Sequence, residues 1–300
     1  MRLMPVRMLC LIAACVSMLA ASAQCRDHLF EPEKISTDYP MRRNLHYSLT
    51  LENLSSETAT GVDFWVHAPV RKTPSQKCLT VVSSEPADLI ADEFGDQVLH
   101  FNFPSIPPFG TKIIQIRAEM ALNETPWAAE LPKKDLFLTS EPMIESGNPE
   151  IIKAALELSA KSEPETAKAL SKWVSASIAY SGYAEKDRGA LYALRNRKGD
   201  CTEYATLFVA LCRALKIPAR VVSGYVYAED SIVEPENFHN WAEVYLDGGW
   251  VTVDPQKKIF NGRSSDFIAF SLAPFGNENS PLKGEHRFWC SEKDIKIKFN

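Results

Sequence analysis

A cysteine at the start of a predicted helix is the residue of this chain most suited to nucleophilic chemistry. Segment 199–203 reads GDCTE, in which Asp200 has the side chain of a helix N-cap and Glu203 completes an aspartate form of the capping box. Cys201 is then the first helical residue, where unpaired backbone N–H groups and the helix dipole favour the thiolate over the thiol. The alternative is a buried structural cysteine, which is less typical of a helix start.

A histidine and an aspartate on a predicted hairpin could complete a catalytic triad. His239 begins an alternating strand over residues 239–246, Asp247-Gly248 is typical of a two-residue turn, and the return strand ends at Asp254. An imidazole can take the proton of a thiol, and a carboxylate can hold the imidazole in place. The residue types and their order therefore indicate a Cys-His-Asp site. The alternative for Asp254 is a turn-forming role before Pro255.

The register of this hairpin places the histidine and the aspartate on one face. A two-residue turn pairs Leu246 with Gly249, which puts Asp254 opposite Trp241. His239 is then the diagonal neighbour of Asp254, and diagonal neighbours are roughly 7–8 Å apart at the backbone, within reach of side chains that lean together. A three-residue turn would move Asp254 to the opposite face, so the hypothesis depends on the turn type.

The remaining cysteines and histidines are weaker candidates. Cys212 lies about 11 residues along the same helix, roughly 16 Å from Cys201, so a disulfide between them is excluded and Cys212 is expected in the core. A metal site built from the triad residues lacks a fourth ligand at suitable spacing, and we expect neither a metal nor another cofactor. The other histidines lie on predicted strands or near the ends of the chain: His28, His46, His67, His100 and His286.

Two hydrophobic patterns define the elements that must position these side chains. From about residue 40 to 122, short runs of alternating apolar and polar residues predict an antiparallel β-sandwich, assigned to residues 24–122. Residues 123–148 are rich in proline and polar residues and are interpreted as a surface linker. Helical spacing then begins at Asn148, Pro164 and Asp200, and strands return from Arg220 onward. This order favours an α+β fold, with a catalytic domain over 149–300 that ends in a strand extension.

The composition excludes several classes of protein. The 300 residues include 33 Lys+Arg and 38 Asp+Glu, a formal net charge of −5, and 45% are hydrophobic. These values are typical of globular proteins and argue against a disordered chain or a coiled coil. An acidic balance without basic runs also argues against a nucleic-acid partner.

The first 23 residues have the pattern of a secretory signal peptide. Two arginines precede an apolar run over 8–20, and small residues at 21–23 form a cleavage site. The run is too short to span a bilayer, and no later stretch is long enough. We therefore expect an exported protein, periplasmic or secreted, without an integral span; the alternative is a lipid anchor at Cys15. In an oxidising compartment, Cys25, Cys78 and Cys290 remain as the candidates for a disulfide, and the alternative is that no disulfide forms.

Four blocks of sequence resemble the transglutaminase-like core domain found in many bacterial and archaeal secreted proteins. The blocks are segments 199–205, 215–220, 239–244 and 249–255, and the resemblance covers roughly residues 150–258. It implies a papain-like core in which a helix bearing the cysteine packs on an antiparallel sheet, often preceded by a β-sandwich. It also implies that Cys201 is the nucleophile, His239 the base and acid, and Asp254 the residue that orients the imidazole.

The oxyanion hole of such a site needs backbone or side-chain donors. The backbone N–H of Cys201 is a natural donor because it lies at a helix start. Tyr180, at the expected end of the second helix, is the preferred second donor, and Trp173 is another candidate. Trp241 could form a wall of the site. For all three aromatic residues, simple packing is the alternative.

The resemblance implies acyl transfer from an amide through a cysteine thioester. We expect a protein or peptide substrate and water as the acceptor, which makes the protein an amidase, deamidase or protease. The alternatives are an amine acceptor, as in a crosslinking transglutaminase, and a non-catalytic binding protein of the cell envelope. No acidic loop of calcium-binding form occurs in the sequence. The sequence leaves the oligomeric state open.

Overall fold

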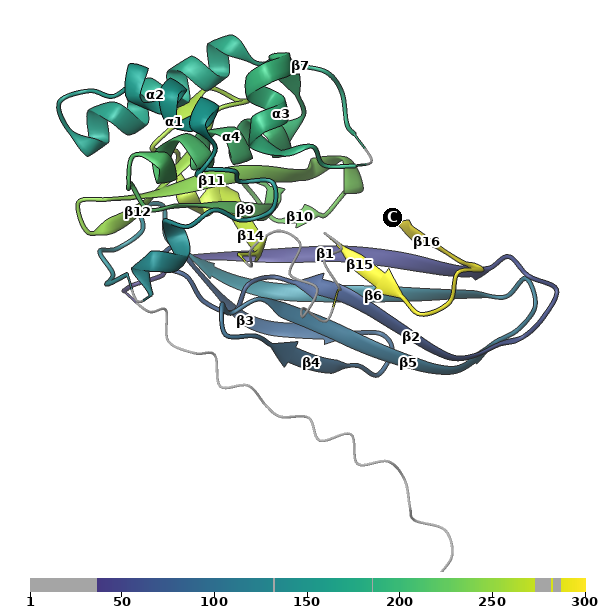
Figure 1. Ribbon diagram of the computed structural model, residues 1–300. Helices are drawn as coiled ribbons and strands as arrows, with labels where there is room; N and C mark the ends of the chain where they lie inside the picture. Colours follow the sequence, from purple (N-terminus) through teal and green to yellow (C-terminus); the bar gives the residue numbers. More distant parts are fainter. Residues whose placement is uncertain (1–36, 132, 185, 273–281, 283–286) are drawn as a thin grey trace, which may run out of the picture. The chain divides into compact units, whose positions relative to one another are not determined.

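Alternating apolar residues build two sheets from the N-terminal half and the last strands of the chain (Figure 1). This computed structural model describes residues 37–131, 133–184, 186–272, 282 and 287–300. The first sheet contains β1 (Met41–Asn53), β3 (Gln76–Ser83), β6 (Thr111–Leu122), β10 (Ser231–Ile232) and β16 (Ile295–Phe299). The second contains β2 (Ala59–Ala68), β4 (Asp88–Ala91), β5 (Gln97–Ile106) and β15 (Phe288–Cys290).

The two sheets enclose one hydrophobic core. Along β1, every second side chain from Leu45 to Leu51 is buried, and this row packs against Phe64 of β2 and Phe101 of β5. The period-two pattern of the sequence produces this arrangement because side chains alternate between the two faces of a strand. The α+β fold with an N-terminal sandwich is therefore as predicted.

The last two strands pair with the sandwich. β16 pairs antiparallel with residues 49–53 of β1, and β15 pairs with residues 64–66 of β2. Ile295 and Phe299 are buried in the same core as the β1 side chains. Strands thus follow the helical segment, as the sequence indicated, but they complete the N-terminal sheets, because their backbones pair with β1 and β2 and their apolar side chains join that core.

Four helices cover the third sheet, which carries the predicted hairpin. The helices are α1 (Pro149–Glu157), α2 (Glu163–Ser177), α3 (Gly189–Asn196) and α4 (Cys201–Ala214). The sheet has the order β13 (Ile259–Phe260), β12 (Gly249–Asp254), β11 (Phe238–Leu246), β9 (Ala219–Val226) and β14 (Phe267–Ser271). A short parallel pair joins β7 (Ala179–Tyr180) and β8 (Lys198–Gly199), and 3₁₀ turns occur at η1 (Lys134–Phe137), η2 (Pro235–Asn237) and η3 (Ser264–Asp266).

The helix starts follow from capping residues. The side chain of Asn148 accepts a hydrogen bond from the backbone of Glu150, with Pro149 as first residue of α1. Ser162 caps α2 in the same way, one residue before the helix begins. The start predicted from Asn148 is confirmed, and the start predicted at Pro164 is one residue late.

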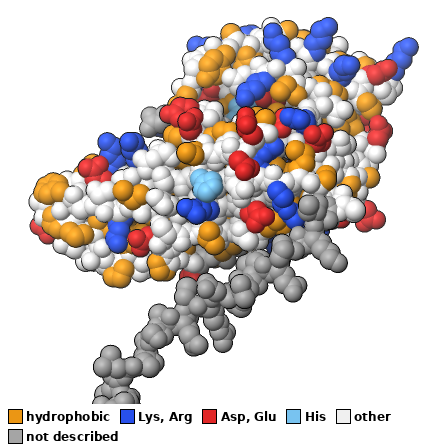
Figure 2. Space-filling view, turned by 180° about the vertical axis from the view of Figure 1, so that it is seen from behind, with side chains coloured by type: hydrophobic (Ala, Val, Ile, Leu, Met, Phe, Trp, Pro, Cys, Tyr) orange, Lys and Arg blue, Asp and Glu red, His pale blue; other side chains and the backbone are white. Residues whose placement is uncertain are grey.

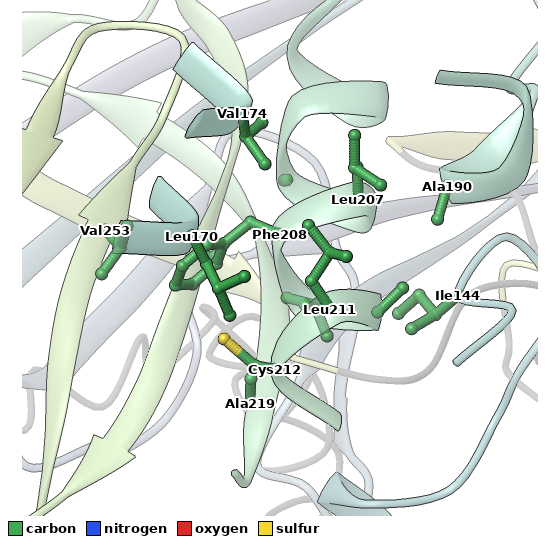
Figure 3. Packing of buried hydrophobic residues seen from close by; sticks show 14 of the residues in the cluster. Ile144, Leu170, Val174, Ala190, Leu207, Phe208, Leu211, Cys212, Ala219 and Val253 are labelled. Atoms are coloured by element: carbon green, nitrogen blue, oxygen red, sulfur yellow. The ribbon is translucent and has the colours of Figure 1, made fainter. Parts of the chain in front are cut away.

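Helix α4 lies at the centre of the second core (Figure 3). Its Phe208, Leu211 and Cys212 pack with Leu170 of α2 and Val253 of β12. Cys212 is fully buried among these apolar side chains, as predicted. Because the helix is buried along almost its whole length, its first residue is fixed relative to the sheet.

Residues 123–148 do more than connect the two sequence regions. The backbone N–H of Ala129 donates to Gly248 O, and Ile144 is buried in the helical core. The buried guanidinium of Arg213 donates to the carbonyl of Thr139 and to Glu141. The segment interpreted as a linker is thus fastened to the turn of the hairpin and to the end of α4.

The remaining sequence predictions concern export, membrane segments, disulfides and charge. The signal peptide, Cys15, Cys25, His28 and His286 lie outside the described residues. Within the described part, no helix is long and apolar enough to cross a membrane. Cys78 and Cys290, the disulfide candidates that the structure covers, are both free thiols. Charged side chains of both signs are interspersed on the face shown in Figure 2.

Candidate active site

The capping box predicted around Cys201 is present. Asp200 is the N-cap of α4, its Oδ1 accepts the backbone N–H of Thr202 at 2.9 Å, and its own N–H donates to Glu203 Oε2 at 2.9 Å. A Cβ at Gly199 would lie 2.3 Å from Glu203 Cβ, so a glycine is required before the cap. Cys201 is therefore the first residue of a rigidly capped helix.

The two cap carboxylates also hold the neighbouring loop. Asp200 Oδ2 accepts the backbone N–H of Ala184 at 2.9 Å. Glu203, which is fully buried, accepts the backbone N–H of Arg188 at 2.9 Å and its Nη2 at 2.7 Å. A change in this loop would therefore reach the helix start directly, through charge-assisted hydrogen bonds.

The hairpin has the predicted register. Leu246 pairs with Gly249 and Ala242 with Val253, as a two-residue turn requires. His239 Nε2 lies 2.7 Å from Asp254 Oδ2, with the side chains only 8% and 1% exposed. Asp254 Oδ1 accepts the backbone N–H of Lys257 at 3.0 Å, which fixes the carboxylate. Because Nε2 faces Asp254, Nδ1 is the ring nitrogen left for the thiol.

Cys201 and His239 border one cavity of about 560 Å³. Its walls come from the first turn of α4, the segment around Tyr180 and Tyr183, residues 235–240 and Arg287. Such a volume lies within the range of ligand pockets in proteins, roughly 300–1,000 Å³. The nucleophile and base predicted from separate parts of the sequence therefore share one accessible space.

The thiol of Cys201 differs in one respect from the prediction. Burial raises the pKa of Cys201 to about 11, and the carboxylates of Asp200 and Asp254 also raise it. The backbone N–H groups of Asn240 and Thr202 act in the opposite direction and lower the pKa of the thiol. The predicted effect of the helix start is therefore outweighed by desolvation, which disfavours the anion. An isolated thiol of this kind stays protonated at neutral pH and needs a base.

The three aromatic residues proposed for the oxyanion hole or wall lie in different places. Tyr180 follows the end of α2 as part of β7, is 60% exposed and borders the cavity. Trp173 packs beside the core, with Arg197 over its ring at 4.6 Å, and is not a cavity residue. Trp241 is 1% exposed, packs against Phe267 and also lies outside the lining. Both tryptophans therefore pack against other side chains, which was the alternative to a role in the site.

The structure adds residues that sequence reasoning missed. Arg287, from the segment before β15, borders the cavity and lies over the ring of Phe238, 5.2 Å from its centroid. Lys257 and Tyr183 border it too. No local pattern marks Arg287, because only the return of the chain to the sandwich brings it to the site. Among the described residues, no group of three or more His, Cys, Asp or Glu could hold a metal.

Comparisons with known proteins find similarity in the segment that carries this site. The family model of the transglutaminase-like superfamily matches residues 152–255, which include Cys201, His239 and Asp254. The chain is 34% identical over 143 residues to the Kyphoscoliosis peptidase of Mus musculus and 32% identical over 134 residues to that of Homo sapiens. These matches cover 45% and 42% of this chain, but only 22% and 20% of the relatives, so the chain spans about a fifth of their length.

A solved structure shares the fold over most of both chains. It is a protein of Cytophaga hutchinsonii described as a candidate cysteine protease, with a TM-score of 0.57 and 17% identity. The similarity covers 87% of this chain and 92% of that one. Residues 152–255 thus match the transglutaminase-like superfamily model, and the similarity of fold extends beyond them.

Proposed function

We propose that the protein is a cysteine-dependent hydrolase of protein or peptide amides. The observation that carries this proposal is the buried contact between His239 and Asp254, 2.7 Å long, beside the cavity that Cys201 borders. A binding protein would have no use for a fixed His-Asp pair next to a cysteine at a helix start. The superfamily match and the shared fold support the same reaction class.

The proposed reaction has two halves. Cys201 Sγ attacks the amide carbon while His239 takes the thiol proton, and the proton passes to the leaving nitrogen as the C–N bond breaks. Water then attacks the thioester with His239 as base, the C–S bond breaks, and the acid leaves as the thiol regains a proton. Asp254 orients the imidazole and stabilises the imidazolium.

The oxyanion needs donors that point into the cavity. We assign the backbone N–H of Cys201 as one donor, because first-turn N–H groups have no acceptor within the helix. Tyr180 is the proposed second donor, since its side chain borders the cavity. A Tyr180→Phe variant that lowers kcat with KM unchanged would support this role.

Water is the proposed acceptor. Its concentration is about 55 M, so an amine competes only where a dedicated site concentrates it. Glu236, on the cavity wall, is the observation that favours the second candidate, amine transfer, because it could attract a cationic amine.

A labelled primary amine separates the two reactions. The protein is incubated with a glutamine-containing protein and the amine, and label incorporation is compared with ammonia release and new termini. Hydrolysis predicts ammonia release or new termini without incorporation of the label. These products must disappear in Cys201→Ala and persist in Cys290→Ala, which removes a free thiol outside the cavity. Efficient, Cys201-dependent labelling would show a crosslinking enzyme instead.

We further propose that the protein acts outside the cytoplasm. This proposal rests on the signal-peptide pattern of residues 1–23. Sequencing the N-terminus of the exported protein provides the test: the first residue should be Gln24. An acylated N-terminal Cys15 would show the lipid-anchored form.

A further inference from the structure

Asn240 connects the strand of the base to the helix of the nucleophile. Its Nδ2 donates to Thr202 Oγ1 at 2.8 Å, and its Oδ1 accepts from Ser223 Oγ at 2.6 Å. Asn240 is only 4% exposed, and its two partners are buried as well. The three side chains form a chain of hydrogen bonds from β9 through β11 to the first turn of α4.

The main chain of the same residue also acts on the nucleophile. The backbone N–H of Asn240 lowers the pKa of the thiol of Cys201, the residue before Thr202. One residue of β11 therefore binds Thr202 and influences the neighbouring thiol.

The position of Asn240 in the sequence gives these contacts their importance. It follows His239 directly, and the pairing of Asn240 with Ser223 places the amide beside its hydroxyl partner on the neighbouring strand. The hydroxyl of Ser223 donates to Oδ1, so the amide nitrogen points toward Thr202. The orientation of the amide is thus set from the sheet.

We propose that Asn240 is a positioning residue, which holds the thiol of Cys201 beside the imidazole of His239 through its paired contacts with Thr202 and Ser223. Its importance for turnover rests on the proposed hydrolase function. Its effect on the thiol does not, because the reactivity of Cys201 toward a small alkylating reagent requires no substrate. The two proposals can therefore fail separately.

Variants of Thr202 and Ser223 test the contact with little change in volume. Thr202→Val removes the acceptor, Thr202→Ser keeps it, and Ser223→Ala removes the donor from a residue that does not border the cavity. Asn240→Ala removes the amide and leaves the backbone N–H. Iodoacetamide alkylation of Cys201 is followed by mass spectrometry from pH 6 to 10, with Cys290 of the same molecule as internal reference.

We expect Asn240→Ala and Thr202→Val to slow the alkylation of Cys201 at pH 7 by about tenfold, the effect of losing one buried hydrogen bond. The rate should also rise with pH through the neutral range, where the wild-type rate is nearly constant, and Ser223→Ala should show a smaller effect in the same direction. Thr202→Ser should restore the wild-type profile, and the rate at Cys290 should not change.

A purely structural role would give a different pattern. In that case the variants would melt at lower temperature, while the rate and pH profile at Cys201 stayed as in the wild type, and the proposal would be overturned. If Asn240→Ala does not fold, the Thr202 pair and Ser223→Ala decide. A wild-type enzyme without amidase activity would overturn the proposed function alone.

Discussion

The raised pKa of Cys201 leads to a quantitative prediction for removal of the base. With a pKa of about 11, an unassisted thiol at pH 7 is ionised in about one molecule in 10⁴, against one in 10² for a pKa of 9. His239→Ala leaves the thiol unassisted. Its alkylation by iodoacetamide should therefore rise about tenfold per pH unit from pH 7 to near 11.

The wild-type protein should behave differently because the thiol can pass its proton to His239. The resulting thiolate and imidazolium pair, stabilised by Asp254, should give a nearly constant alkylation rate around neutral pH. At pH 7 the variant should therefore react slower by one to two orders of magnitude or more. The assay follows the Cys201 peptide by mass spectrometry at each pH.

A second His-Asp pair provides the control. His100 Nε2 lies 2.7 Å from Asp63 Oδ1, on the sandwich and outside the cavity. His100→Ala removes an equally short contact and should leave the profile of Cys201 unchanged. The reasoning would be refuted if His239→Ala kept the wild-type rate at pH 7, or if the wild-type rate rose tenfold per unit through the whole range.

The other predictions concern the thiol, the triad and the cap. Cys201 should alkylate at least about tenfold faster than Cys212 at pH 7, since Cys212 is fully buried and burial raises its pKa further; peptide mapping under native conditions measures both, and equal rates would contradict the site. Asp254→Asn should lower kcat by about 10³-fold or more with KM little changed, because an asparagine can favour the His239 tautomer with the proton on Nδ1. Steady-state kinetics on an amide substrate measures this effect, and an activity near that of the wild type would contradict it. Gly199→Ala should destabilise the protein by about 1–3 kcal/mol, since the added methyl overlaps Glu203; a urea midpoint equal to that of the wild type would rule out the strain.

The features that the sequence predicts are those determined by neighbouring residues. The capping box needs only Asp200 and Glu203, three residues apart. The hairpin register follows from the Asp247-Gly248 turn, and the contact between His239 and Asp254 follows from that register. Local rules of this kind do not depend on how the rest of the chain packs.

The features that the sequence does not predict depend on packing between distant segments. The pKa of Cys201 is raised because the fold removes the thiol from water, which no helix-start rule includes. Trp241 looks like a site residue beside His239, yet its ring is buried against Phe267. Arg287 reaches the cavity only because the strand after it belongs to the sandwich.

The pairing of β16 with β1 has a consequence for the time course of synthesis. The side chains of Thr50 and Asn300 are hydrogen-bonded at 2.9 Å, although they lie 250 residues apart in the sequence. As the protein emerges from a ribosome, residues 49–53 therefore keep an open strand edge until residues 295–299 follow, and such an edge can pair with other chains. Contacts of such long range also slow folding. A chain that stopped between Asp254 and residue 295 would thus contain Cys201, His239 and Asp254 but leave this edge of the sandwich open.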